Sequence, residues 1–137
     1  MSSVADLLGA ASLAFGALSI FYSLWSRELQ DAIDAIVQPH RESRGPDIYK
    51  CKLLLKSRAW PLFLISNAIS LILAPPAISI IYNVLQAFWN LGWNAFREYD
   101  AVSAMLVAIW VLFLFFDFLS FSLVRKLKIK LKKMLEK

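Results

Sequence analysis

Three long stretches of the sequence are almost free of charged side chains, and this feature limits the fold more than any other. They cover about residues 4–25, 60–96 and 101–124. About 20 consecutive, predominantly apolar residues are enough for one α-helix to cross the hydrocarbon core of a bilayer. The sequence therefore predicts an all-α integral membrane protein with three transmembrane helices.

Composition supports the same fold class. Of the 137 residues, 59% are hydrophobic and 18% are charged, whereas a soluble domain has about 45–50% apolar and about 25% charged residues. The first stretch has no Lys or Arg before it and is longer than the ~7–15 apolar residues of a secretory signal. We expect it to be retained as a helix, and we expect residues 1–137 to form a single membrane domain.

The order of apolar and charged segments predicts boundaries within this domain. Pro75 and Pro76 interrupt the second stretch and predict a kink there. The expected segments are transmembrane helices at about 4–25, 61–82 and 101–124, a cytoplasmic hairpin at about 27–59, and a basic cytoplasmic tail at 125–137.

Residues 83–96 allow two interpretations. Polar side chains recur at helical spacing opposite large apolar ones such as Trp89 and Trp93, a pattern typical of a helix lying in the outer membrane interface. The alternative is one long, tilted second helix that ends near Gly92.

The basic residues predict the direction of the helices. Seven lie between the first two stretches, seven follow the third, and only Arg97 lies on the other side. Because Lys and Arg accumulate on the cytoplasmic side, we expect the N-terminus outside and the C-terminus in the cytoplasm, at the inner (plasma) membrane of a bacterium. The single cysteine, Cys51, excludes an internal disulfide.

The hairpin at 27–59 is predicted to extend the first two transmembrane helices into the cytoplasm as antiparallel arms. Apolar residues share one face of each arm, Pro39 ends the first arm, and Gly45 and Pro46 mark a turn. The first arm is rich in acids and the second in lysines, so the arms are complementary in charge. The hairpin either packs only on itself, which we favour because any exposed hairpin is amphipathic, or docks a cytoplasmic partner.

A stripe of small residues follows one face of the first stretch. Its members are spaced by 4, 3, 4, 3, 4 and 3 residues: Ala5, Gly9, Ser12, Gly16, Ser19, Ser23 and Ser26. This heptad spacing keeps one face turned to a neighbouring helix in a left-handed crossing, and small residues permit close approach in lipid. The stripe predicts packing against the chain's own helices, a symmetric oligomer, or a serine-lined pore.

Asp117 is a charged side chain well inside the third stretch. An unpaired carboxylate in hydrocarbon costs at least ~2.5–3.5 kcal/mol, so a polar partner is expected. Counting depth from the ends of the helices nominates Asn67 and Ser19. The predicted Asp117, Asn67 and Ser19 cluster either holds the helices together or forms an ion- or proton-sensitive site.

The segment after the third stretch alternates basic and apolar residues. Its basic side chains are predicted to face anionic lipid headgroups of the inner leaflet; they are Arg125, Lys126, Lys128, Lys130, Lys132 and Lys133. Leu127, Leu131, Met134 and Leu135 share one helical face and suggest an inner-leaflet anchor. No aromatic residues are interleaved with the lysines, which argues against a nucleic-acid partner.

Catalytic and metal-binding patterns are missing from the sequence. There is no nucleophile elbow, no phosphate-binding loop and no suitably spaced carboxylate pair. His40 is the only histidine, and it lies near Glu42 in a polar loop; no Cys/His pair has metal-ligand spacing. We expect no enzymatic activity and no metal or cofactor.

Two hypotheses for function remain. The first, which we rank higher, is an accessory, assembly or immunity-type subunit whose helices dock on another membrane protein. The second is a self-associating pore or ion-conducting protein. The layout of three spans with an outer N-terminus, an inner C-terminus and a basic tail resembles that of one class of phage holins, which would imply the second hypothesis. The resemblance covers no sequence motif, and the long hairpin departs from that layout.

Overall fold

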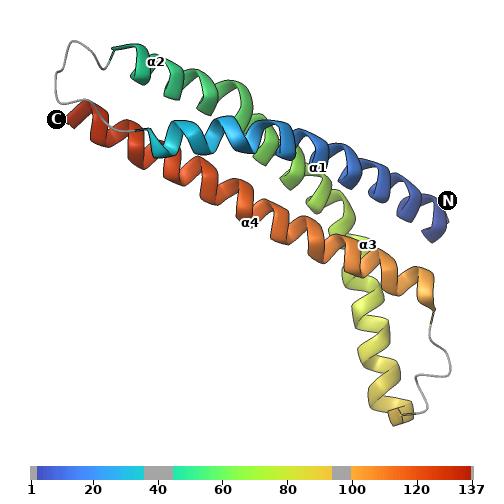
Figure 1. Ribbon diagram of the computed structural model, residues 1–137. Helices are drawn as coiled ribbons and strands as arrows, with labels where there is room; N and C mark the ends of the chain where they lie inside the picture. The colour runs from blue at the N-terminus through green and yellow to red at the C-terminus, as the bar shows by residue number, and fades with distance from the viewer. Residues whose placement is uncertain (1–2, 36–44, 94–99, 137) are drawn as a thin grey trace. The chain divides into compact units, whose positions relative to one another are not determined.

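The computed structural model describes residues 3–35, 45–93 and 100–136, and within these ranges it has helices and no strand. Figure 1 follows the chain from α1 in blue to α4 in red. Three continuous helical segments are long and apolar enough to cross a membrane: Val4–Asp34, Gly45–Leu91 and Ala101–Glu136. The predicted all-helical fold with three membrane-crossing helices is therefore confirmed at this level.

Helix α1 (Val4–Asp34) starts with a reciprocal pair of side chains. The Asp6 N–H donates to Ser3 Oγ at 3.2 Å, while the Ser3 N–H and Oγ–H donate to Asp6 Oδ2 at 3.0 and 2.8 Å. These bonds satisfy donors that have no partner in the first turn of a helix. The helix then continues beyond the predicted membrane boundary at residue 25 to Asp34.

The second long segment consists of α2 (Gly45–Leu54), the π-helical turn η2 (Leu55–Ala59) and α3 (Trp60–Leu91). In η2 the Trp60 N–H donates to the Leu55 carbonyl, five residues back, so one extra residue is inserted into the helix. Pro75 and Pro76 lie inside α3 without ending it.

Helix α3 ends at Leu91, and Gly92 has a φ of +55°. Glycine adopts this left-handed conformation without steric cost, which makes it a common helix terminator. Residues 83–91 therefore continue α3, as in the alternative of one long helix that ends near Gly92. Residues 94–96 lie outside the described residues, and the interfacial placement of 83–96 stays a prediction.

Helix α4 (Ala101–Glu136) begins after the N-cap residue Asp100. The carboxylate of Asp100 accepts hydrogen bonds from the N–H groups of Val102 (3.1 Å) and Ser103 (3.2 Å) and from the Ser103 hydroxyl. These bonds hold the pKa of Asp100 below its usual value. Because α4 extends to Glu136, the basic segment predicted as a tail is a helical extension of the third span.

The chain divides into two compact units, and each is described separately. The first unit comprises Met1–Ala17 and Asn67–Phe115. Its buried residues come from all three long helices: Ala11 from α1, Leu73 and Ala77 from α3, and Leu106 and Phe113 from α4. The rings of Phe15 and Phe113 meet edge to face with centroids 5.4 Å apart, and the indole N–H of Trp110 donates to the Ser70 carbonyl at 3.1 Å.

The second unit comprises Leu18–Ser66 and Phe116–Lys137. One hydrophobic cluster forms its core, with Leu29 and Ala32 from α1, Cys51 and Leu54 from α2, Ala59 from η2, and Leu123, Val124, Leu127 and Met134 from α4. The end of α4 thus packs together with α1 and α2, whereas the sequence suggested that residues 27–59 pack only on themselves. Its apolar face is buried in protein, because Leu127 and Met134 are only 1% and 5% exposed.

Candidate functional site

The small-residue stripe of α1 lies almost entirely on the surface. Its members Ala5, Gly9, Ser12, Gly16 and Ser23 are exposed, and Ser19 and Ser26 are half-buried. The buried residues of the same helix, including Ala11, Leu18 and Leu29, lie roughly 120° around the helix from the stripe at 100° per residue. The buried face of α1 is therefore a different one from the stripe, and the neighbour against which the stripe packs stays a prediction.

The two glycines of the stripe have open space beside them. A Cβ atom added at Gly9 or Gly16 would meet no other heavy atom within 4 Å. The hydroxyl of Ser12 donates to the Leu8 carbonyl at 2.8 Å, so this serine adds little polarity to the face. The result is a shallow, nearly apolar surface that a second helix can approach closely.

Asp117 is buried in the second unit, as expected for a carboxylate inside a span. Ser19, in the same unit, is half-buried. Asn67 is also half-buried but belongs to the first unit. The cluster of these three residues stays a prediction.

Two buried serines of the second unit were missed by the sequence reasoning. Ser66 and Ser120 are 0% and 1% exposed, and within the described residues their hydroxyls have no hydrogen-bond partner. Buried hydroxyls normally have one, so these two positions can accept a polar group. Ser120 follows Asp117 by one helical turn, a spacing that the sequence displays. Ser66 precedes Asn67, and depth counting cannot tell which of two neighbours faces inward.

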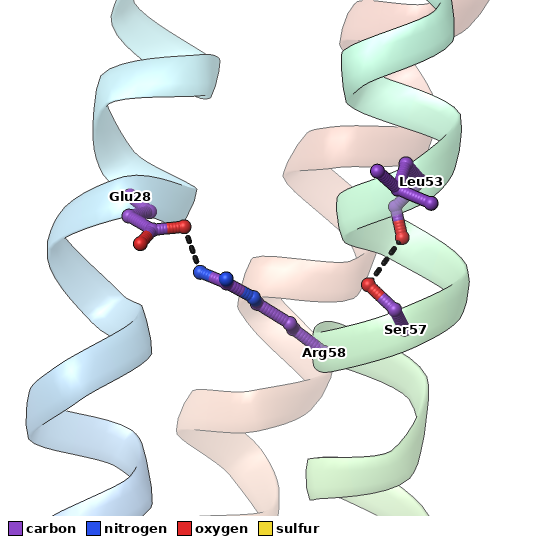
Figure 2. Close-up of polar contacts among 4 residues, drawn as sticks. All are labelled: Glu28, Leu53, Ser57 and Arg58. Atoms are coloured by element: carbon purple, nitrogen blue, oxygen red, sulfur yellow. Dashed lines mark hydrogen bonds and ion pairs between the residues drawn. The ribbon is translucent and has the colours of Figure 1, made fainter.

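An ion pair joins α1 to η2 in the second unit. Figure 2 shows the Arg58 guanidinium pointing at the Glu28 carboxylate, and Ser57 donating from its hydroxyl to the Leu53 carbonyl at 2.7 Å. The pair is partly exposed, with 31% and 53% of the two side chains accessible, so its contribution to stability is at most about 1 kcal/mol. It joins an acidic and a basic side chain of residues 27–59, and the predicted complementarity between acids and lysines of the two arms stays a prediction.

The basic residues of α4 have two different environments. Five of them are exposed, and their contact with lipid headgroups stays a prediction: Arg125, Lys126, Lys128, Lys132 and Lys133. Lys130 is half-buried, and its ammonium group donates to the carbonyls of Ile33 and Ala35. Lys130 therefore contacts the end of α1.

Lys128 contacts an aromatic ring at the start of α3. Its Nζ atom lies 4.8 Å from the centroid of the Trp60 ring, within the range of a cation–π interaction. The Trp60 ring also meets Phe63 at a centroid distance of 6.2 Å, and Phe63 meets Phe121 of α4 at 5.8 Å. These contacts attach α3 to α4 within the second unit.

Cys51 lies in a small pocket of the second unit together with Asp31, Asp47, Lys50 and Met134. Burial raises the pKa of its thiol, an effect that the positive charge of Lys130 partly offsets. The ranges 3–35, 45–93 and 100–136 contain no group of three or more side chains placed to hold a metal ion. His40, Glu42 and Arg97 lie outside the described residues.

Comparisons of the chain with protein-family models, with curated proteins and with solved structures find no match.

Proposed function

We propose that this chain is a small, non-enzymatic integral membrane protein that acts through helix–helix association, as an accessory, assembly or immunity-type subunit of a membrane complex. The observation behind the proposal is the exposed small-residue face of α1, where a Cβ added at Gly9 or Gly16 would meet no other part of the structure within 4 Å. In lipid, large side chains already interact well with acyl chains, whereas a flat face of small residues gains most from a second helix.

We propose that the helix binding to this face of α1 belongs to another membrane protein. Under the proposal the N-terminus is outside, residues 27–59 and 125–137 are in the cytoplasm, and the membrane is the inner membrane of a bacterium. Fourteen of the fifteen basic residues then lie in the cytoplasm, as the distribution of Lys and Arg in membrane proteins favours.

A self-associating pore or ion-conducting protein is the second candidate. It is favoured by the buried polar residues Ser66, Asp117 and Ser120 in the second unit. Ionisable residues inside membrane helices often mark ion pathways. In this case the α1 face would contact further copies of the same chain.

The mass of the complex extracted in a mild detergent tests the proposal. A subunit of a larger complex is recovered together with a stoichiometric membrane partner. Recovery of a homo-oligomer that makes liposomes leaky, with the leak altered by Asp117→Asn, would support the second candidate instead. A monomer with tight liposomes would contradict both.

A further inference from the structure

The pair formed by Trp60 and Lys128 lies where two apolar segments meet basic ones. Trp60 opens the uncharged stretch of α3, and Lys128 follows Arg125, the first basic residue after the third span. The cation–π contact of 4.8 Å holds the two side chains together. The Phe63 and Phe121 rings, 5.8 Å apart, continue the same contact surface into the apolar part of α3 and α4.

This pair has hydrogen-bond donors available for a ligand. The Lys128 ammonium has three N–H donors and is exposed. Within the described part of the chain, the indole N–H of Trp60 donates to no protein acceptor, in contrast to that of Trp110, which donates to Ser70. A cation and a neutral N–H donor are thus presented side by side.

Further positive charge surrounds the pair. Lys56 precedes Trp60 by one turn, and Arg125 and Lys132 flank Lys128 by one turn on either side. All three are exposed. Lys132 pairs with Glu136 at 3.4 Å, so Lys56 and Arg125 contribute most of the additional charge.

An apolar surface continues from the same helix faces. Leu64 follows Trp60 by one turn of α3, and Phe121 precedes Lys128 by two turns of α4, so each shares a face with its partner in the pair. Leu64 is 56% exposed and Phe121 is 51% exposed. A ligand with an anionic group at the pair and long apolar chains along Leu64 and Phe121 matches both halves of this surface.

We propose that Trp60 and Lys128, supported by Lys56 and Arg125, bind the phosphate of an anionic phospholipid headgroup, with the acyl chains lying along Leu64 and Phe121. Basic and aromatic side chains at the membrane interface recognise such headgroups through charge and hydrogen bonding. This site includes no residue of α1. The lipid-binding proposal can therefore be tested independently of the proposed helix association.

Native mass spectrometry of the full chain in detergent, titrated with phosphatidylglycerol, tests the site. Lys128→Gln is compared with Lys126→Gln, which makes the same charge change at nearly the same depth but on the opposite face of α4. We expect Lys128→Gln to weaken phosphatidylglycerol binding about five-fold, because it removes the basic side chain that contacts the headgroup, whereas Lys126 faces away from the pair. Lys126→Gln should change it less than about two-fold, and Lys128→Arg should retain binding.

Three results would overturn the inference. Equal losses for Lys128→Gln and Lys126→Gln would mean that the basic segment attracts anions without a defined site. Equal binding of phosphatidylcholine with the same acyl chains would mean that the net negative charge of the headgroup is not recognised, because its phosphate is balanced by a choline cation. Complete displacement of the lipid by inorganic phosphate would mean that the apolar surface makes no contribution. Circular dichroism of each variant verifies that the helices are retained.

Discussion

The ammonium group of Lys130 donates a 2.6 Å hydrogen bond to the backbone carbonyl of Ile33, which lies 97 residues earlier in the chain. A second bond goes to the carbonyl of Ala35. Helix α1 ends at Asp34, where carbonyl groups lack partners within the helix. A lysine at this end also interacts favourably with the helix dipole, so α4 stabilises the end of α1 within the second unit.

Replacing Lys130 by Met should therefore destabilise the second unit. We expect a loss of about 1–2 kcal/mol in the free energy of unfolding, because the hydrogen bonds come from a charged donor. Denaturation in mixed micelles with increasing SDS measures this change. Lys133→Met is the control, since Lys133 is exposed and has no contact with α1 among the described residues; an equal effect of both variants would contradict the role of Lys130.

Leu127→Ala tests whether the end of α4 belongs to a protein core. Leu127 is 1% exposed, and truncating a fully buried leucine costs about 2–4 kcal/mol. The matched control is Leu135→Ala, because Leu135 is 54% exposed and should lose less than about 0.5 kcal/mol. The same SDS titration compares them. Similar values for both would indicate that this segment packs on lipid and not on α1 and α2.

Features within one helix could be predicted from the sequence, whereas contacts between distant residues could not. The three spans were predictable, because apolar length is visible within one helix. The contact of Lys130 with Ile33 was not, since nothing local links residues so far apart. Leu127 and Met134 formed an apolar stripe in the sequence, but such a stripe looks the same whether its partner is lipid or another helix.

Two further features show the same limit. The extra residue of η2 has no sequence signature, because a π-helical turn depends on how the flanking helices are held. Counting depth along the helix nominates Asn67 but does not reveal the burial of its neighbour Ser66, because depth alone does not say which way a side chain faces. The division into two units could not be predicted either, because the uncharged stretch 60–96 continues without a break across the boundary between Ser66 and Asn67.

The thiol of Cys51 should be protected from reagents. It is 3% exposed, and burial raises its pKa above the ordinary value of 9.0. At neutral pH we expect slow reaction with a water-soluble maleimide, whereas a cysteine placed at the exposed Tyr49, in a chain with Cys51→Ser, should react rapidly. Equal rates would contradict the burial of Cys51.

The same raised pKa predicts a dependence of stability on alkaline pH. The unfolded chain releases the thiol proton at lower pH than the folded chain, so the contribution of Cys51 is complete below the unfolded pKa. It falls as the pH rises through and above about 9. Thermal unfolding of the wild type and of Cys51→Ser should therefore diverge in this range; identical curves above pH 9 would argue against the shift.

Asp100 should stabilise the first turn of α4. Asp100→Ala removes an acceptor for the Val102 and Ser103 N–H groups, so these amides should exchange hydrogen faster, while Asp100→Asn can still cap the helix. Because the folded pKa is below 3.8, the stabilisation is present above that pH and is lost as the pH falls through the lower, folded value. Exchange rates that are the same in wild type and Asp100→Ala near neutral pH would exclude a capping role.

The proposed function requires the small-residue face of α1 to bind a helix from another membrane protein. Gly16→Leu adds a large side chain to this face at an exposed position where the space around an added Cβ is open. Ala10→Leu adds the same side chain at an exposed position on a different face. The decisive measurement is the mass of the complex extracted in mild detergent for both variants. Loss of the partner with Gly16→Leu and its retention with Ala10→Leu are expected, whereas a complex unchanged by Gly16→Leu would contradict the claim.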